Sequence, residues 1–228
     1  MEKLIVVLIA AHLLGDFLCQ PDWLIERKKK FPFLLLHGLI HALLVYVLYQ
    51  AWASWQLPVV ILAVHLAIDL AKQRSKSDSA KAFAWDQGAH IFSLIGIGWL
   101  FTEMGWQPAF SGQGYSLMVG VAGFVATTLG AGYFVGKVAT TLKEQNDLKI
   151  CGLLNGGEWI GNLERALIYL LIFVGQPTGI GFLVAAKSIL RFHDTKEQRH
   201  TEYVLIGTLL SFSLAIALAT ATNWAMRL

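Results

Sequence analysis

Charged residues and cysteine are both scarce in this chain of 228 residues. Lys, Arg, Asp and Glu together make up 14% of it, and it contains two cysteines. A soluble domain carries roughly 25% charged residues, and a disulfide-stabilised scaffold depends on several cysteine pairs. The composition therefore excludes both classes. The formal net charge is +3, and the positive residues are too scattered to indicate a nucleic-acid partner.

Hydrophobic residues, by contrast, make up 56% of the chain, and its mean hydropathy is +0.57. They form eight apolar segments, at about residues 3–20, 33–53, 57–72, 82–102, 115–137, 152–174, 178–191 and 203–225. Most approach the ~20 residues with which a helix crosses a bilayer, where the backbone must satisfy its own hydrogen bonds. We therefore expect an all-α, polytopic membrane protein with about eight transmembrane helices. Segments 57–72 and 178–191 are short, and whether they span fully stays open.

The distribution of basic residues predicts the orientation of these helices. Lys and Arg lie in the loops around residues 27–30, 72–81, 143–149 and 191–199, whereas the intervening loops contain neither. Cytoplasmic loops of membrane proteins carry an excess of Lys and Arg. We therefore expect these four loops in the cytoplasm and both termini on the opposite, periplasmic side.

Each of the first four expected helices carries one pair of ionisable residues spaced by four positions. The pairs are His12 and Asp16, His37 and His41, His65 and Asp69, and Asp86 and His90. Residues four apart in a helix lie one above the other on the same face, ~5–6 Å apart. Each helix therefore offers one polar face, a single turn tall, within an otherwise apolar sequence.

The alternating direction of the helices places all four pairs near the cytoplasmic side of the membrane. At ~1.5 Å per residue, each pair lies roughly 5–12 Å inside its helix end, so the first four helices are expected to form a bundle lined with His and Asp. The deeper layer contains His12, His41, His65 and His90, and the shallow layer contains Asp16, His37, Asp69 and Asp86. An ionisable group at such depth costs on the order of 2.5–3.5 kcal/mol, which a bound cation would offset. A purely structural polar network is the alternative.

The types of ligand narrow the choice of metal. Imidazole and carboxylate without thiolate favour Zn²⁺, with Mn²⁺ and Fe²⁺ as alternatives. Eight candidates exceed the needs of one ion, so the sequence suits either two ions or one ion whose ligands are oriented by nearby carboxylates. Two ions would clamp the attacking and leaving oxygens of a phosphoester. Haem fits less well, because the Asp partners would have no role in it.

Several segments resemble an uncharacterised family of bacterial multi-pass membrane proteins, catalogued only as a domain of unknown function. They are AHLLGDFLCQPDWL (11–24), LLHGLIHALL (35–44), VHLAIDLAKQR (64–74), WDQGAH (85–90), GEWIGNLERALIYLLI (157–172) and AAKSILRF (185–192). More distantly, roughly the first hundred residues resemble bacterial membrane-bound metal-dependent hydrolases. The second resemblance implies that the eight His and Asp residues are the ligand pool. Together the resemblances imply a bacterial inner-membrane protein.

We divide the chain into a metal-binding bundle, residues 1–102, and a second membrane half, residues 103–228. The second half carries Glu158, Glu164 and Arg165 on one expected helix, with Lys187 and Arg191 on one face of the next. In a functional interpretation, the side chains of Arg165, Lys187 and Arg191 bind a lipid headgroup. Glu158 or Glu164 is then a general base or an added metal ligand. An ion-pair network among the same residues is the alternative, and it is slightly favoured.

The leading hypothesis is a metal-dependent hydrolase that acts on a lipid ester or phosphoester at the cytoplasmic leaflet. Asp86 would accept a proton from the attacking water, and Lys72 would position water or phosphate, although a lysine at a helix end commonly only snorkels. The alternatives are a transporter of divalent metal or protons, and a metal-stabilised scaffold or sensor. Membrane lipid is the expected partner, and homo-oligomerisation stays open.

Overall fold

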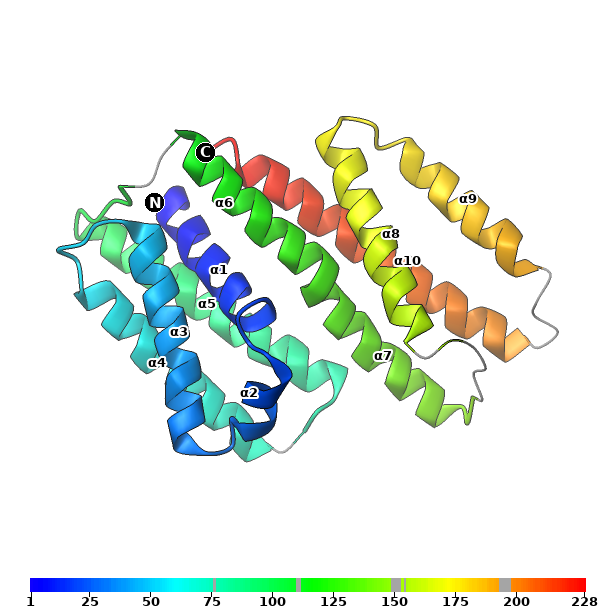
Figure 1. The fold of residues 1–228 in the computed structure, drawn as a ribbon, viewed down its shortest axis with the longest axis horizontal. Helices are drawn as coiled ribbons and strands as arrows, with labels where there is room; N and C mark the ends of the chain where they lie inside the picture. The colour runs from blue at the N-terminus through cyan, green and yellow to red at the C-terminus, as the bar shows by residue number, and fades with distance from the viewer. Residues whose placement is uncertain (76, 110–111, 149–152, 154, 193–197) are drawn as a thin grey trace. The chain divides into compact units, whose positions relative to one another are not determined.

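The computed structural model describes residues 1–75, 77–109, 112–148, 153, 155–192 and 198–228, with the backbone alone for residues 190–192 (Figure 1). The helices are α1 (Glu2–Phe17), α2 (Asp22–Arg27), α3 (Phe31–Tyr49), α4 (Gln56–Ser75), α5 (Ala80–Glu103), α6 (Gly112–Val125), the π-helix η1 (Ala126–Gly130), α7 (Ala131–Gln145), α8 (Gly156–Phe173), α9 (Gly179–Phe192) and α10 (Gln198–Ala225). Among the described residues there is no strand. The prediction of an all-α fold is therefore confirmed.

In the part of the chain that the structure describes, four helices are long and apolar enough to cross a membrane: Phe31–Tyr49, Gln56–Ser75, Gly112–Gln145 and Gln198–Ala225. The third is the continuous run of α6, η1 and α7. The short expected segment 57–72 lies within α4, one of the four, whereas segment 178–191 corresponds to the shorter apolar helix α9. The helices are those of a membrane protein. That the chain crosses the membrane eight times, and that both termini are periplasmic, remain predictions.

The chain divides into two compact units. Unit 1 contains Met1–Val125 together with Trp224–Leu228, and unit 2 contains Ala126–Asn223. This grouping by contact does not test the functional division that we expected after residue 102. All four His/Asp pairs fall within unit 1.

Unit 1 is a closed bundle in which α1 packs against α3, α3 against α4, α4 against α5, and α5 against α1. Helix α6 packs on the outside of α1, where the Tyr115 hydroxyl donates to the Ala225 carbonyl at 3.1 Å. Local sequence sets the helix ends: Ser79 Oγ accepts from Ala82 N at the start of α5, and Gln50 ends α3 in a left-handed conformation with φ of 58°. Closure of the bundle turns one face of every helix inward.

The inward face of each bundle helix repeats every four residues and changes character along its length. One half is apolar, and its buried side chains form a core with Leu8, Val45, Tyr49, Ile61 and Leu94 among its members. The other half continues the same inward face with the four His/Asp pairs. Of their eight side chains, all but that of Asp16 are buried. The expected bundle lined with His and Asp is therefore what the chain forms.

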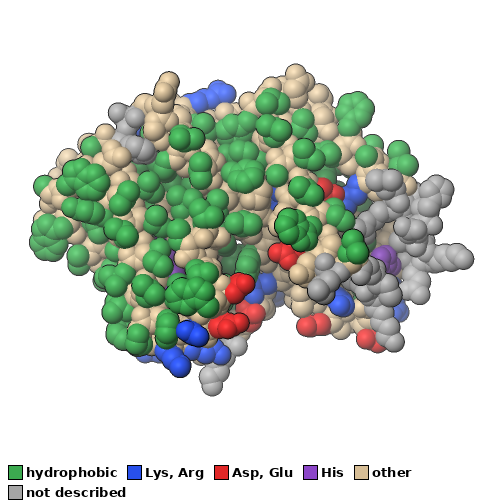
Figure 2. All heavy atoms as spheres, viewed as in Figure 1, with side chains coloured by type: hydrophobic (Ala, Val, Ile, Leu, Met, Phe, Trp, Pro, Cys, Tyr) green, Lys and Arg blue, Asp and Glu red, His purple; other side chains and the backbone are tan. Residues whose placement is uncertain are grey.

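The outward face of unit 1 is hydrophobic, as a lipid-facing surface would be. Leu43 on α3 and Phe92 and Trp99 on α5 are exposed. Figure 2 shows hydrophobic side chains spread over the visible face around α3, with Lys and Arg gathered at the end where α2 lies. The basic residues 27–30 include Arg27, the last residue of α2, and the three lysines that follow it. Lys76, Lys149 and Lys196, from the other basic loops, lie outside the described residues.

Candidate metal centre

Four ligand atoms from three helices of unit 1 converge on one point. Asp16 Oδ1 lies 3.2 Å from His37 Nε2, 3.2 Å from His41 Nε2 and 4.0 Å from His65 Nε2. The Nε2 atoms of His37 and His65 are 3.0 Å apart. All four atoms lie within 4.8 Å of one another. Helices α1, α3 and α4 thus present three imidazoles and one carboxylate to a common centre.

The spacing of these atoms suits a tetrahedral ion. Zn²⁺ binds imidazole nitrogen and carboxylate oxygen at ~2.0–2.2 Å, which makes the edge of the tetrahedron about 3.3 Å. The observed separations of 3.0, 3.2 and 3.2 Å fall near that edge, and the fourth, 4.0 Å, is somewhat longer. The three imidazoles are buried and the Asp16 side chain is 11% exposed. The cluster can therefore hold a divalent ion without large rearrangement.

A glycine permits one of these side chains to reach the centre. A Cβ atom at Gly15 would overlap the His41 ring. Helices α1 and α3 can therefore bring Asp16 and His41 together only where α1 carries no side chain at position 15. The sequence offered no sign of this requirement.

Gln87 connects the carboxylate of Asp16 to the fourth bundle helix. Its Nε2 donates to Asp16 Oδ2 at 2.9 Å and approaches Asp86 Oδ2 at 3.5 Å. Its Oε1 faces His12 Nε2 at 3.2 Å, and since an amide oxygen only accepts, His12 is the donor. His12 therefore lies beside the four-atom group and orients Asp16 through Gln87.

His65, Asp69 and His90 form a second group whose ligand atoms lie within 4.8 Å of one another. His65 belongs to both groups. His65 Nε2 is 3.6 Å from Asp69 Oδ2, and the His65 and His90 rings are 4.3 Å apart. The two groups are therefore adjacent and share a ligand.

The other two carboxylates of the cluster, those of Asp69 and Asp86, each form an ion pair with a lysine. Lys28 Nζ is 2.9 Å from Asp69 Oδ2, and Lys72 Nζ is 2.6 Å from Asp86 Oδ2. Both carboxylates are buried, while the Lys72 side chain is 38% exposed. Lys72 therefore lies between the cluster and the surroundings, next to the residue that we expected to be the general base.

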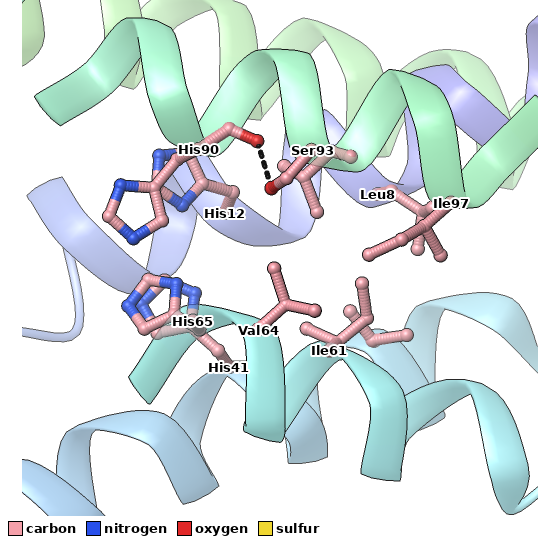
Figure 3. A pocket seen from close by; sticks show the side chains of 11 residues that line it. Leu8, His12, His41, Ile61, Val64, His65, His90, Ser93 and Ile97 are labelled. Carbon is pink, nitrogen blue, oxygen red and sulfur yellow. Dashed lines mark hydrogen bonds between the residues drawn. The ribbon is translucent and has the colours of Figure 1, made fainter. Parts of the chain in front are cut away.

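A small pocket adjoins the imidazoles on the apolar side of the cluster. Figure 3 shows His12, His41, His65 and His90 together at one end, with Leu8, Ile61, Val64 and Ile97 lining the other. The Ser93 hydroxyl donates to the His90 carbonyl at 2.7 Å. The free volume is about 10 Å³, close to the room that one water molecule needs. The pocket is therefore too small for a lipid chain.

All eight expected ligands meet within unit 1, in different positions. Six of them, including Asp16, form the two ligand groups. Of the other two, His12 orients Asp16 through Gln87, and Asp86 pairs with Lys72. Sequence reasoning missed Gln87 and Lys28. Gln87 lies three residues before His90 on α5, a spacing that places both on one helix face. Lys28 has no comparable spacing to a ligand, and its place in a run of basic residues indicates only the orientation of the helices.

The expected headgroup residues belong to unit 2, where Arg165 is buried among neutral acceptors. Its Nε donates to the Thr128 carbonyl at 3.0 Å, Nη1 to Ser211 Oγ at 2.9 Å and Nη2 to Asn162 Oδ1 at 2.6 Å. Thr128 lies in the π-helix η1. The backbone hydrogen-bond pattern of a π-helix differs from that of an α-helix. In this segment the Arg165 guanidinium donates a hydrogen bond to a backbone carbonyl. Arg165 therefore joins three helices of unit 2.

The described side chains among the other expected headgroup residues do not gather at a common site. Lys187 Nζ donates to Glu164 Oε2 at 2.6 Å, which is the ion pair of the alternative interpretation. Glu158 is exposed on α8. Arg191 lies in the last turn of α9, and its side chain is outside the described residues. A phosphate-binding role for these residues stays a prediction.

Comparison with known proteins supports the family resemblance for the first half of the chain. A family described as "Protein of unknown function (DUF3307)" matches residues 4–113, which include every His and Asp of the cluster. Neither the curated proteins nor the solved structures yield a match. These comparisons give no support to the more distant resemblance to metal-dependent hydrolases, and the matched family carries no assigned activity.

Proposed function

We propose that unit 1 binds a divalent transition-metal ion and uses it to hydrolyse a lipid ester or phosphoester. The proposal rests on one observation: the Nε2 atoms of His37, His41 and His65 meet Asp16 Oδ1 at separations that suit a tetrahedral ion. Three imidazoles and a carboxylate form a borderline-hard ligand set that suits Zn²⁺, Mn²⁺ or Fe²⁺. The buried position of these groups in a membrane-spanning bundle would otherwise be costly.

The residues around the cluster suit hydrolysis. A divalent ion held there would supply Lewis-acid chemistry, and a water that joined it as a further ligand would have a lowered pKa. Asp86 Oδ1 is buried and has no hydrogen-bond partner among the described residues, which supports its proposed role as the proton acceptor. Lys72, on the other oxygen of Asp86, would neutralise negative charge that develops on the substrate.

Substrate access is proposed from the side of Asp16 and Lys72. Asp16 is the most exposed side chain of the four-atom group at 11%, and Lys72 is 38% exposed. Both lie toward the helix ends that the basic loops mark as cytoplasmic. A headgroup at the membrane surface could reach this side while its acyl chains stay in lipid.

The experiment is a hydrolysis assay on purified protein in vesicles of mixed phospholipids, with release of phosphate and fatty acid as readouts. We expect turnover that is abolished by a chelator and restored by Zn²⁺, Mn²⁺ or Fe²⁺. His41→Ala should lose both bound metal and turnover, whereas the exposed α3 variant Leu43→Ala should retain both. Turnover that survives complete removal of metal would refute the proposal.

A second candidate function, transport of a divalent ion, is favoured by the shared ligand His65. Because two adjacent groups have this residue in common, an ion could pass from one group to the other by exchanging partners. Metal flux into proteoliposomes separates the two functions. Flux without hydrolysis supports transport, and hydrolysis without flux supports the enzyme.

A further inference from the structure

The second ligand group of unit 1 contains an imidazole that is prepared to bind a cation. His90 Nδ1 lies 2.9 Å from the Asp86 carbonyl, and since a carbonyl only accepts, Nδ1 carries the hydrogen. In the neutral ring, Nε2 then carries a lone pair. This atom is buried, in a residue that is 2% exposed, and it has no hydrogen-bond partner among the described residues. Metal-binding histidines are commonly oriented by such a bond from the other ring nitrogen.

The carboxylate of the same group already holds a cation from the chain itself. Lys28 Nζ lies 2.9 Å from Asp69 Oδ2. The backbone of Lys28 is fixed as well, because Gln73 Nε2 on α4 donates to its carbonyl at 3.0 Å. Lys28 is the first residue after the short helix α2, so the chain folds back under the bundle to bring this ammonium to Asp69.

The balance of charge disfavours a second metal ion beside the lysines. Asp16, Asp69 and Asp86 are negative, and Lys28 and Lys72 are positive. With neutral imidazoles, one divalent ion leaves the cluster with a single net positive charge. A second divalent ion would leave three positive charges within a buried site, where charge is poorly screened.

We propose that the ammonium of Lys28 takes the place of a second metal ion, so that the centre holds one ion and keeps a latent second site at Asp69 and His90. This inference rests on the metal centre proposed above. The first ion binds at Asp16, His37, His41 and His65. Removal of the Lys28 charge frees the Asp69 carboxylate, and a second ion then binds with His90 Nε2 as a ligand.

The test is the number of zinc ions per chain in purified full-length protein, measured by elemental analysis after equilibration with excess Zn²⁺ and desalting. We expect one zinc in the wild-type protein and two in Lys28→Met, whose side chain keeps a similar length without the charge. Lys29→Met, at the adjacent exposed position, should keep one zinc. The double variant Lys28→Met with His90→Ala should return to one.

Two zinc ions in the wild-type protein, or one in folded Lys28→Met, would overturn the inference while leaving the metal centre intact. No zinc in the wild-type protein would overturn the metal centre and the inference with it. Should Lys28→Met not fold, titration of the wild-type protein with zinc still decides, because a second equivalent that binds in the presence of Lys28 contradicts the proposal.

Discussion

The two units of this protein bury polar side chains in opposite ways. In unit 2, Arg165 is a donor surrounded by acceptors: a carbonyl, a hydroxyl and an amide oxygen. In unit 1, atoms that can bind a cation face one another, as at the 3.0 Å approach of the His37 and His65 Nε2 atoms. Each nitrogen of the Arg165 guanidinium therefore has an acceptor within unit 2. The unit 1 cluster would gain a common partner from a cation, and this difference supports the proposed metal centre in unit 1.

The largest effect is expected from loss of the histidine that the two ligand groups share. His65→Ala removes a ligand from both groups, so bound metal should fall from about one ion per chain to near zero. Elemental analysis of the purified variant measures this. Val59→Ala, at an exposed position on the same helix, is the matched control and should bind metal normally. Normal metal content in His65→Ala would contradict the assignment.

A smaller effect is expected from the residue that orients Asp16. Gln87→Met removes the bridge between His12 and Asp16 but keeps a side chain of similar length. Metal affinity should fall by about 10–100-fold, as for other residues that orient metal ligands. Competition with a fluorescent zinc chelator measures the affinity. Trp85→Phe, exposed on the same helix, serves as the control, and an unchanged affinity in Gln87→Met would show that the bridge has no role.

Loss of the buried cation in unit 2 should change stability and leave metal binding intact. Arg165→Met leaves Asn162 Oδ1 and the buried Ser211 Oγ without this donor, and a buried group left unsatisfied costs about 1–3 kcal/mol. Denaturant unfolding in mixed micelles gives the change in free energy, with the exposed Leu167→Met as control. A drop in bound metal in folded Arg165→Met would break the distinction between the two units.

The smallest effect is expected at the ion pair between Lys187 and Glu164. Both side chains are partly exposed, at 19% and 14%, and such pairs contribute about 0–1 kcal/mol. Lys187→Met should therefore change the unfolding free energy by less than about 1 kcal/mol. A double-mutant cycle with Glu164→Gln isolates the pair. A much larger coupling energy would indicate that the pair belongs to a more demanding site.

The bundle and the meeting of its His/Asp pairs could be predicted because both follow from short-range periodicity. A spacing of four places His37 above His41 on one helix face, and alternating helix direction brings the pairs of different helices to one level. The apolar half of each inner stripe follows the same repeat. No distant contact was needed for these predictions.

The remaining features depend on contacts that the local pattern does not contain. Lys28 reaches Asp69 because the short helix α2 turns the chain back after α1. The sequence of this basic loop does not predict that the chain takes this direction. The choice of Asp16 as a ligand, with His12 as its support, depends on the side chain of Gln87 from another helix. The hydrogen bond from Arg165 on α8 to the Thr128 carbonyl of the π-helix Ala126–Gly130 is likewise a contact between distant parts of the sequence.

The most direct test of the central claim is X-ray absorption at the metal edge of the purified full-length protein. Our account predicts one divalent transition-metal ion per chain, with nitrogen and oxygen ligands at about 2.0–2.2 Å and outer-shell scattering from three imidazole rings. A protein without an ion, or an ion whose ligands include sulfur or fewer than two imidazoles, would contradict the assignment of His37, His41, His65 and Asp16.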